Sequence, residues 1–481
     1  MIERKNPRTA KIGLFAVAHK PYWAQFDGLY DNLMGYHEEL KKKLVANGVE
    51  VVDFGMSDSS ERAFEIADQA CAAQPDIMIC NMVTYATSSV FAPILRAINC
   101  PMVLVALQPR EALDYTKANT FMQLENDNVC SVPEFTGVAI RFGKKISDVI
   151  FGTLWNDTEA DEKIAEWCNI ACVLHDLKGA RLGLMGHVLE AMYDMHADPT
   201  AITASFGAHV PLLEVDDVVE VYQTVTEDEI QAKSELILRE FDTPDPGSDP
   251  IACKLTDADL RQAAKTAAAL DKLVDKYNLT GLAYYYGGLE DTIQREVASS
   301  FIVGNSILNA QGIPMCGEFD IKTLVAMLIM DRLDIGGSFA ELHPFDFASN
   351  CILIGHDGPH HLRIAEGRPV LRSLLKYHGK PGRGASVEFK LKEGPITMLG
   401  ITQNANGKFK FVIGEGYSQK GPIPPTGNTN TRGCFDSPLK DFIKRWVMEG
   451  PTHHYALGIG HHAETIAKIA DALNIEYVIV R

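Results

Sequence analysis

The sequence predicts an α/β protein: two doubly wound parallel-sheet domains followed by a mostly antiparallel, barrel-like β domain at the C-terminus. Until about residue 335, short apolar runs alternate with helix-periodic segments, which is typical of parallel sheets covered by helices on both faces. Beyond that point, short β-like runs separated by glycine replace the alternation. A chain of 481 residues is too long for one ordinary core. We therefore expect three domains, at residues 1–172, 173–335 and 336–481.

The first domain is predicted from four apolar runs, which we expect to be strands at residues 11–18, 49–55, 76–83 and 102–107. A polar-apolar segment between the first two runs predicts a helix that ends near Ala46. The loop at residues 18–23 follows the first strand. Ligands of open α/β sheets bind at the carboxyl ends of the strands, so this loop is a candidate binding segment.

The second domain repeats the alternation, with strands expected at residues 182–185, 210–215, 279–286 and 313–316. Thr256 and Asp259 have the spacing of a capping box, which predicts that a long helix begins there and ends near Tyr277. A further helix is expected at residues 322–330.

The third domain is predicted from β-like runs at residues 351–355, 387–391, 396–402 and 408–415, with glycines between them. Helix-periodic segments are sparse here until residues 463–473. One terminal helix and a last strand at residues 475–480 complete the expected antiparallel sheet or barrel.

Composition excludes several classes of protein. The net charge is -18, without a basic cluster, which argues against nucleic acid or an anionic membrane surface as a partner. No apolar stretch is long enough to span a bilayer, and the polar first residues lack the apolar middle of a secretory signal. The ten cysteines include no Cys-x-x-Cys pair. Reduced thiols in a cytoplasmic protein are the interpretation that fits them.

Acids and imidazoles stand at the edges of four apolar runs. Paired histidines, His461 and His462, occupy an expected strand-to-helix turn, where they can point into a cleft. Glu318 lies on a turn between a strand and a helix, Glu341 follows a Gly-Gly pair, and His356 ends a strand. Two carboxylates and two imidazoles can surround a divalent cation and leave positions open for substrate oxygens. We interpret the four segments as one metal site.

Each of these residues also has an ordinary structural interpretation, as a solvated acid or a structural histidine. His343 and Asp346 are substitutes for Glu341, and several other histidines surround His356 in the sequence, namely His360, His361 and His378. Adjacent residues of an extended segment point in opposite directions, so only one of the His461–His462 pair can reach a given metal. A second pair, His453 and His454, starts the same run and is assigned to a different layer.

Taken together, four segments resemble the L-arabinose isomerase and L-fucose isomerase superfamily. The family run A-E-G-D-W-K-T is similar to Gly317-Glu318-Phe319-Asp320-Ile321-Lys322-Thr323. The family G-G-T-S-F-M-E-D is similar to Gly336-Gly337-Ser338-Phe339-Ala340-Glu341, with one residue fewer. The family L-G-S-H and G-G-A-H-H-T resemble Ile354-Gly355-His356 and Gly458-Ile459-Gly460-His461-His462-Ala463. Order and approximate spacing agree across roughly the C-terminal third of the chain.

The resemblance implies a metal-dependent aldose–ketose isomerase that acts on a monosaccharide through a cis-enediol(ate). It implies Mn²⁺, or another divalent cation, held by Glu318, Glu341, His356 and His462, the second histidine of its pair. It also implies a homotrimer or homohexamer whose active site is shared between subunits. Glu318 and Glu341 are the expected acid and base, because isomerisation moves a proton between two adjacent carbons.

The chain departs from the family where arabinose isomerases contact their sugar. The family run Q-T-A-H-G-G-R-E-F is replaced by residues 127–135, and S-Q-H-L-Y-G by residues 18–23. We therefore expect a sugar other than L-arabinose: another pentose, a deoxyhexose, or a 6-sulfo sugar such as sulfoquinovose. Lys20 or an arginine, such as Arg110 or Arg432, could bind an anionic group at C6. The candidate substrate contacts are His19, Trp23, Asp127, Cys130, Arg432 and His461.

Two alternatives use the same residues. The first is a non-catalytic sugar-binding protein on the same fold. The second is a metal-dependent hydrolase or lyase, because a metal site does not by itself fix the reaction. Products of unchanged mass indicate the isomerase, and cleavage products indicate the hydrolase or lyase.

Overall fold

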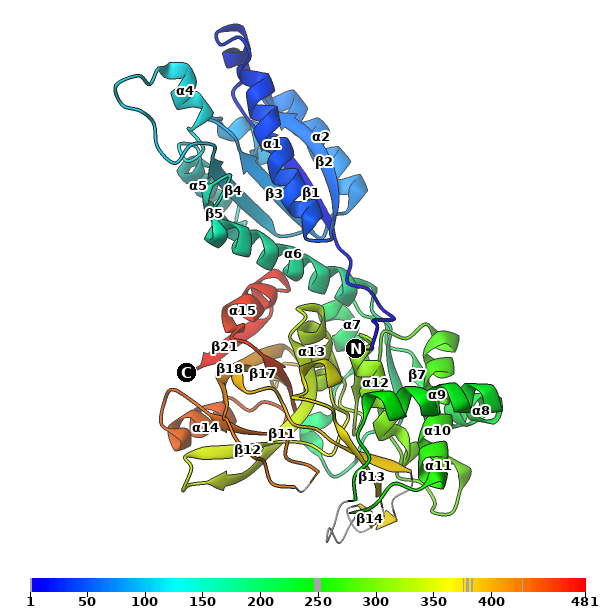
Figure 1. The fold of residues 1–481 in the computed structure, drawn as a ribbon. Coiled ribbons are helices and arrows are strands. Elements are labelled where there is room, and N and C mark those ends of the chain that lie inside the picture. The colour runs from blue at the N-terminus through cyan, green and yellow to red at the C-terminus, as the bar shows by residue number, and fades with distance from the viewer. Residues whose placement is uncertain (1, 246–251, 375, 378–379, 382–383, 426) are drawn as a thin grey trace. The chain divides into compact units, whose positions relative to one another are not determined.

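The computed structural model describes residues 2–245, 252–374, 376–377, 380–381, 384–425 and 427–481. The chain divides into two compact units (Figure 1). The smaller unit is Arg8–Asp176, and the larger unit consists of Met1–Pro7 and Leu177–Arg481. The predicted class is confirmed: helices accompany two parallel sheets, and an antiparallel barrel follows. Within the described ranges, no helix is both long enough and apolar enough to cross a membrane.

The smaller unit contains a five-stranded sheet in the order β2-β1-β3-β4-β5, in which every pairing is parallel. Side chains alternate between its two faces. Phe15 and Val17 pack into a core with one set of helices, and Ala16 and Ala18 pack into a second core with Leu29. The sheet is therefore covered on both faces, as predicted. Its strands are β1 (Lys11–Val17), β2 (Glu50–Ser57), β3 (Ile77–Met82), β4 (Met102–Gln108) and β5 (Asp148–Thr153).

The helices of this unit separate the strands in sequence, as a doubly wound sheet requires. They are α1 (Leu29–Ala46), α2 (Ser60–Ala73), α3 (Ala92–Ala97), α4 (Thr120–Glu125), α5 (Val132–Arg141) and α6 (Thr158–Gly179). Strand order reverses between the neighbours β1 and β3, so their carboxyl ends form the crevice where such sheets bind ligands.

The larger unit begins with a second parallel sheet, in the order β10-β9-β6-β7. Its strands are β6 (Leu182–Gly186), β7 (Leu212–Leu213), β9 (Gly281–Tyr285) and β10 (Met315–Cys316). The predicted capping box is confirmed, because Thr256 and Asp259 begin α10 (Asp257–Tyr277) with reciprocal hydrogen bonds. The other helices are α7 (Pro199–Phe206), α8 (Val215–Gln223), α9 (Glu227–Glu240), α11 (Ile293–Ala298) and α12 (Phe301–Ala310).

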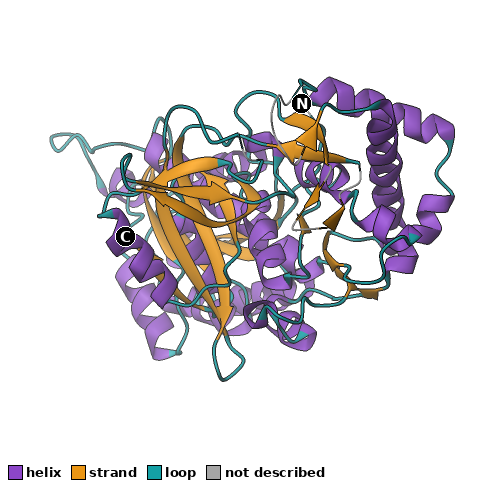
Figure 2. Cartoon of the chain, turned by 90° about the horizontal axis from the view of Figure 1, so that it is seen from below, coloured by secondary structure: helices purple, strands orange, loops and turns teal. Residues whose placement is uncertain are grey.

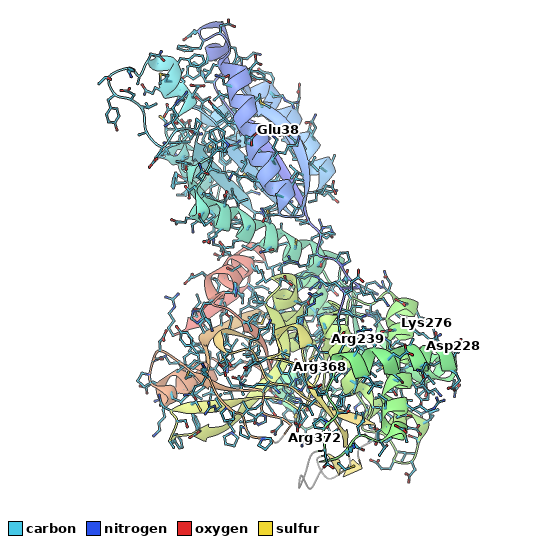
Figure 3. All side chains as sticks on the ribbon, in the orientation of Figure 1. Glu38, Asp228, Arg239, Lys276, Arg368 and Arg372 are labelled. Atoms are coloured by element: carbon cyan, nitrogen blue, oxygen red, sulfur yellow. The ribbon has the colours of Figure 1, made fainter. Side chains whose placement is uncertain are left out.

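Ion pairs on the surface of this helical layer join neighbouring helices. Figure 3 places Asp228 on α9 and Lys276 on α10, among the charged side chains of that surface. The Lys276 ammonium lies 2.8 Å from the Glu220 carboxylate of α8, and Lys272 of α10 pairs with Glu229 of α9 at 2.7 Å. Such exposed pairs contribute little individually.

The C-terminal part of the larger unit is a closed antiparallel barrel (Figure 2). The strands follow the order β17-β20-β11-β12-β19-β18, and pairing between β17 and β18 closes the barrel. They are β11 (Gly336–Asp346), β12 (Cys351–Gly355), β17 (Gly394–Gln403), β18 (Phe409–Ser418), β19 (Thr431–Cys434) and β20 (Tyr455–Ile459). The additional elements are the helices α14 (Leu439–Met448) and α15 (Ala463–Ala472) and the strand β21 (Glu476–Val480), parallel to β18.

Two small antiparallel sheets complete the unit. One has the order β16-β13-β8 and the other pairs β14 with β15. Their strands are β8 (Ala252–Cys253), β13 (Val370–Leu374), β14 (Lys376–Tyr377), β15 (Lys380–Pro381) and β16 (Ala385–Glu388).

One helix, α13 (Ile321–Arg332), packs on both the second parallel sheet and the barrel. It contacts β6, β9 and β10 on one side and β11, β17 and β20 on the other. All twelve of its residues are buried, as expected for a helix enclosed on every side. Sheet and barrel therefore belong to one compact unit, and the predicted domain boundary after residue 335 stays a prediction.

A buried carboxylate near the end of α13 anchors the first residues of the chain. Asp331 is 1% exposed and accepts hydrogen bonds from Arg4, Arg332 and His361. Burial alone would raise the pKa of Asp331, but the His361 hydrogen bond and the charge of Arg332 outweigh burial and lower the pKa. The fold therefore favours the ionised carboxylate.

We expect Asp331→Asn to lower the free energy of unfolding by about 3–5 kcal/mol, because the variant leaves a buried guanidinium beside a neutral group. A lowered folded pKa adds stability above the ordinary aspartate pKa of about 3.9 and loses it as the pH falls below that value. Urea unfolding followed by circular dichroism should therefore show a larger loss at pH 7 than at about pH 3. Asp334→Asn is the control: this exposed carboxylate lies 3.8 Å from Arg4, and its loss should cost less than about 1 kcal/mol. Equal losses in both variants would contradict the prediction.

Candidate metal centre

Glu318 lies on the turn between β10 and α13, at the carboxyl edge of the second parallel sheet. Glu318 and Phe319 have φ values of 57° and 65°, in the left-handed region that non-glycine residues rarely adopt. Hydrogen bonds on both sides hold this turn. Phe319 N donates to Tyr284 O at 2.9 Å. The Asp320 carboxylate accepts from Thr323 N at 3.1 Å, and this hydrogen bond caps the start of α13. Such strain, of about 1 kcal/mol or more per residue, is common at functional sites.

The register of the barrel places three further residues together. Glu341 of β11 pairs with Gly355, so it lies next to His356, which follows β12. Ala340 pairs with Tyr455, so His454, which precedes β20, lies at the same level. A carboxylate oxygen of Glu341 and one ring nitrogen each of His356 and His454 lie within 4.8 Å of one another. Glu318, His453 and His454 form a second group with the same spacing, so His454 belongs to both.

The spacing between Glu318 and the two imidazoles suits a shared cation. Glu318 Oε1 lies 3.7 Å from His356 Nε2, and Glu318 Oε2 lies 3.9 Å from His454 Nε2. These distances are too long for hydrogen bonds. Two ligand atoms that are each about 2.1 Å from one cation can be at most about 4.2 Å apart. Glu318 Oε2 and His454 Nε2 are buried and have no hydrogen-bond partner among the described residues, a costly state that a cation would relieve.

Both histidines are held in the orientation that leaves Nε2 available. His356 Nδ1 lies 2.8 Å from Gly358 O, and a carbonyl can only accept, so this nitrogen donates. His454 Nδ1 likewise lies 3.3 Å from an Asp320 carboxylate oxygen. The Phe339 ring contacts both imidazoles, at centroid distances of 4.5 and 4.3 Å. Outer partners of this kind orient histidines that ligate metals.

The electrostatics of the centre favour an ionised Glu318. Burial works to raise the pKa of its carboxyl, but the close approach of His356 and the charge of His454 outweigh burial and lower the pKa. Burial also lowers the pKa of His454, which leaves the ring neutral near pH 7. An ionised carboxylate and a neutral imidazole are the forms that bind metal cations.

Comparison with known proteins finds no family model that matches the chain. An L-arabinose isomerase of Herpetosiphon aurantiacus is 23% identical over 89% of this chain and 85% of that protein. An L-arabinose isomerase of a Nocardioides species is 25% identical over 88% of this chain and 84% of that protein. Another, of Thermotoga maritima, is 24% identical over 68% of this chain and 65% of that protein. The chain is therefore similar to L-arabinose isomerases over most of its length.

The predicted ligand His462 belongs to neither group of possible ligands among the described residues. Gly458, near the end of β20, pairs with Gly336 at the start of β11, whereas His454 lies level with Glu341. The five residues of β20 and Gly460 lie between the two histidine pairs, and the strand alone spans about 16 Å of extended chain. His462 is the N-cap of α15, and its backbone N donates to Thr397 Oγ1 at 3.0 Å.

Two predicted substrate contacts in the larger unit also lie outside both groups. His461 Nε2 lies 3.0 Å from Gly416 O, on the His462 side of β20. Arg432 of β19 donates to Lys420 O at 2.5 Å. The roles of Arg432 and His461 as substrate contacts stay predictions.

The other histidines and acids that could have served as ligands lie elsewhere. His343 Nε2 lies 3.7 Å from a Glu341 carboxylate oxygen, so it is a neighbour of the centre. Asp346 accepts from Ser349 N at the end of β11. His360 stacks on Phe389 in the core, His361 binds Asp331, and His378 lies outside the described residues.

The remaining predicted contacts lie in the smaller unit, at the carboxyl edge of its sheet. The His19 ring contacts Tyr22 at 5.1 Å and Tyr85 at 5.8 Å. Burial raises the pKa of Tyr22, and neighbouring Tyr85, Asp127 and Cys130 add to the shift. Three of the four predicted residues therefore share one aromatic neighbour, which the sequence analysis missed. The fourth, Trp23, donates from Nε1 to Asp58 Oδ2 at 2.7 Å.

Proposed function

We propose that this protein is a metal-dependent aldose–ketose isomerase that acts on a monosaccharide through a cis-enediolate. The observation that supports the proposal most strongly is the convergence of Glu318, Glu341, His356 and His454 around buried atoms that lack hydrogen-bond partners within the described part of the chain. The relatives at 23–25% identity are named L-arabinose isomerase, which supports the same reaction class.

Glu318, Glu341, His356 and His454 would hold the cation. Two carboxylates and two imidazoles form a mixed oxygen and nitrogen set, which suits Mn²⁺ and similar divalent cations. His454 replaces the predicted His462 in this proposal. A divalent cation held there would supply positive charge that stabilises the negative charge of an enediolate.

The two glutamates provide the acid and the base. Isomerisation removes a proton from one carbon of the C1–C2 pair and returns it to the other, and a carboxylate can carry that proton. Glu318 is on the turn before α13 and Glu341 is in β11, so the two carboxylates come from different elements. The lowered pKa of Glu318 keeps this carboxylate ready to accept a proton at neutral pH.

The substrate we propose is a sugar other than L-arabinose: another pentose, a deoxyhexose or a 6-sulfo hexose. The support is the replacement of the family's sugar-contacting runs by residues 18–23 and 127–135. We further propose a cytoplasmic homotrimer or homohexamer with the active site shared between subunits. Sedimentation of the purified protein tests the assembly: a monomer would contradict it.

A substrate screen tests the proposed reaction. The protein is stripped with EDTA, reloaded with Mn²⁺ and incubated with aldoses that include 6-deoxy and 6-sulfo hexoses, and ketose formation is followed by NMR. We expect one aldose to be converted, and only after metal is restored. Tightly bound metal with no conversion of any aldose, or with cleavage products, would contradict the isomerase and favour the hydrolase or lyase.

A further inference from the structure

A chain of polar contacts runs from buried Lys322 through Asp194 to His453, beside the candidate metal centre. Lys322 Nζ donates to the backbone carbonyls of Asp194, at 2.5 Å, and His196, at 3.3 Å. The Asp194 carboxylate in turn accepts two hydrogen bonds from His453. The two ends of this chain are 131 residues apart in sequence (453 minus 322), so packing of the larger unit brings them together.

Lys322 fixes the backbone of the loop that follows β6. The residue is 2% exposed, and burying an ammonium group is costly unless its donors are used. Its hydrogen bonds to Asp194 and His196 use carbonyl acceptors of this loop. The position of the Asp194 backbone therefore depends on α13, the helix that begins beside Glu318.

Asp194 fixes the ring of His453. One carboxylate oxygen, Oδ2, accepts from His453 N at 2.9 Å and from His453 Nδ1 at 2.6 Å. Because His453 Nδ1 is hydrogen-bonded to the Asp194 carboxylate, Nε2 is the ring nitrogen that remains for another partner. The His453 ring also contacts the His454 ring at a centroid distance of 3.9 Å.

The His453 ring lies at the open side of the centre. Its side chain is 36% exposed, whereas that of His454 is 1% exposed. A His453 ring nitrogen lies within 4.8 Å of both a Glu318 oxygen and a His454 nitrogen. His454 Nδ1 is engaged by Asp320, so His454 offers one nitrogen and can serve one cation. With Glu318, Glu341, His356 and His454 around that cation, His453 is placed to contact a ligand beside it.

We propose that Asp194 is a positioning residue, held by Lys322, which aims His453 Nε2 at a hydroxyl of the sugar bound beside Glu318. The inference rests on the proposed function. It adds a specific contact outside the metal ligands, and it assigns a role to the loop after β6.

The shared acceptor oxygen allows a sharp test. Asp194→Asn keeps a carbonyl oxygen that can accept both hydrogen bonds, whereas Asp194→Leu keeps similar volume and removes both. Asp198→Leu is the matched control: Asp198 caps α7 by accepting from Thr200 N and lies in the same loop region. Each variant is assayed for kcat and KM, for Mn²⁺ affinity by electron paramagnetic resonance, and for affinity toward an alditol by calorimetry. The alditol is the reduced form of the aldose that is converted, or L-arabinitol if none is converted.

We expect Asp194→Leu to lower kcat/KM and alditol affinity by about 10- to 100-fold, as for other partners that orient active-site groups. Mn²⁺ affinity should stay within about threefold of the wild type, and Asp194→Asn should restore most of the loss. Asp198→Leu should affect thermal stability only. Unchanged alditol affinity in Asp194→Leu, or equal losses in Asp194→Leu and Asp194→Asn, would overturn the proposal.

Failure of the proposed function gives a different result. A wild-type protein that binds the alditol but converts no aldose overturns the isomerase alone, and the alditol affinities of the variants still decide the role of Asp194. A wild-type protein that binds Mn²⁺ but neither converts an aldose nor binds an alditol overturns both proposals.

Discussion

Glu341→Gln should abolish isomerase turnover while the protein stays folded. The variant keeps the size of the side chain and removes the charge that the proposed acid–base role requires, so we expect kcat to fall by about 100- to 10,000-fold. Glu341 lies in β11, where its backbone pairs with β12, and this pairing does not depend on the side chain. The measurement is the rate of ketose formation by NMR, with circular dichroism to show that the fold is retained.

Glu415→Gln is the control for this variant. Glu415 is another barrel glutamate, in β18, and accepts from Ala463 N at 2.8 Å, a bond that a glutamine oxygen can also accept. Its kcat should stay within about threefold of the wild type, because its role is to cap a helix. Near-normal turnover in Glu341→Gln would remove Glu341 from the mechanism.

His454→Gln should release the metal, and His462→Gln should not. His454 Nε2 is buried beside Glu318 without a hydrogen-bond partner among the described residues, whereas His462 is the N-cap residue of α15 and its backbone N donates to Thr397. We expect Mn²⁺ affinity to fall by at least about 10- to 100-fold in His454→Gln, the loss typical even of partners that only orient metal ligands. Calorimetric titration of the EDTA-stripped proteins with Mn²⁺ makes the comparison.

Glutamine keeps a similar volume in the buried site, so we expect both variants to fold. Thermal melting of both variants shows whether each is folded at the temperature of the titration. Loss of metal from His462→Gln, with wild-type affinity in His454→Gln, would return the ligand role to His462.

Much of the fold follows from the local pattern of apolar residues in the sequence. β1, β3 and β4 are fully or almost fully buried strands, and their continuous apolar runs predicted them within one or two residues. The edge strand β5 has only one buried residue, Ile150, so its mixed sequence gave no clear signal. β11 was missed because Gly336 and Gly337 suggested a turn. Both glycines have positive φ, 101° and 105°, but they begin a long strand that contains Glu341.

The candidate metal centre was predictable in part. Glu318 and His356 lie at the ends of predicted strands, where side chains can point into a cleft, and His356 lies near both Glu318 and Glu341. The histidine pairs at the two ends of β20 could not be separated by local sequence. The pairing of Ala340 with Tyr455 places His454 level with Glu341. The residues around either histidine pair do not determine this register between strands distant in sequence.

The order of synthesis has a consequence for how the two units form. The smaller unit is one continuous segment, Arg8–Asp176, so all of its residues are available before most of the larger unit has been translated. The larger unit contains residues from both sides of that segment. Arg4 donates to the Asp331 carboxylate, and Arg363 Nη2 donates to Ile2 O. Ile2 and Arg4 are therefore synthesised before the smaller unit, and their partners Arg363 and Asp331 follow more than 300 residues later.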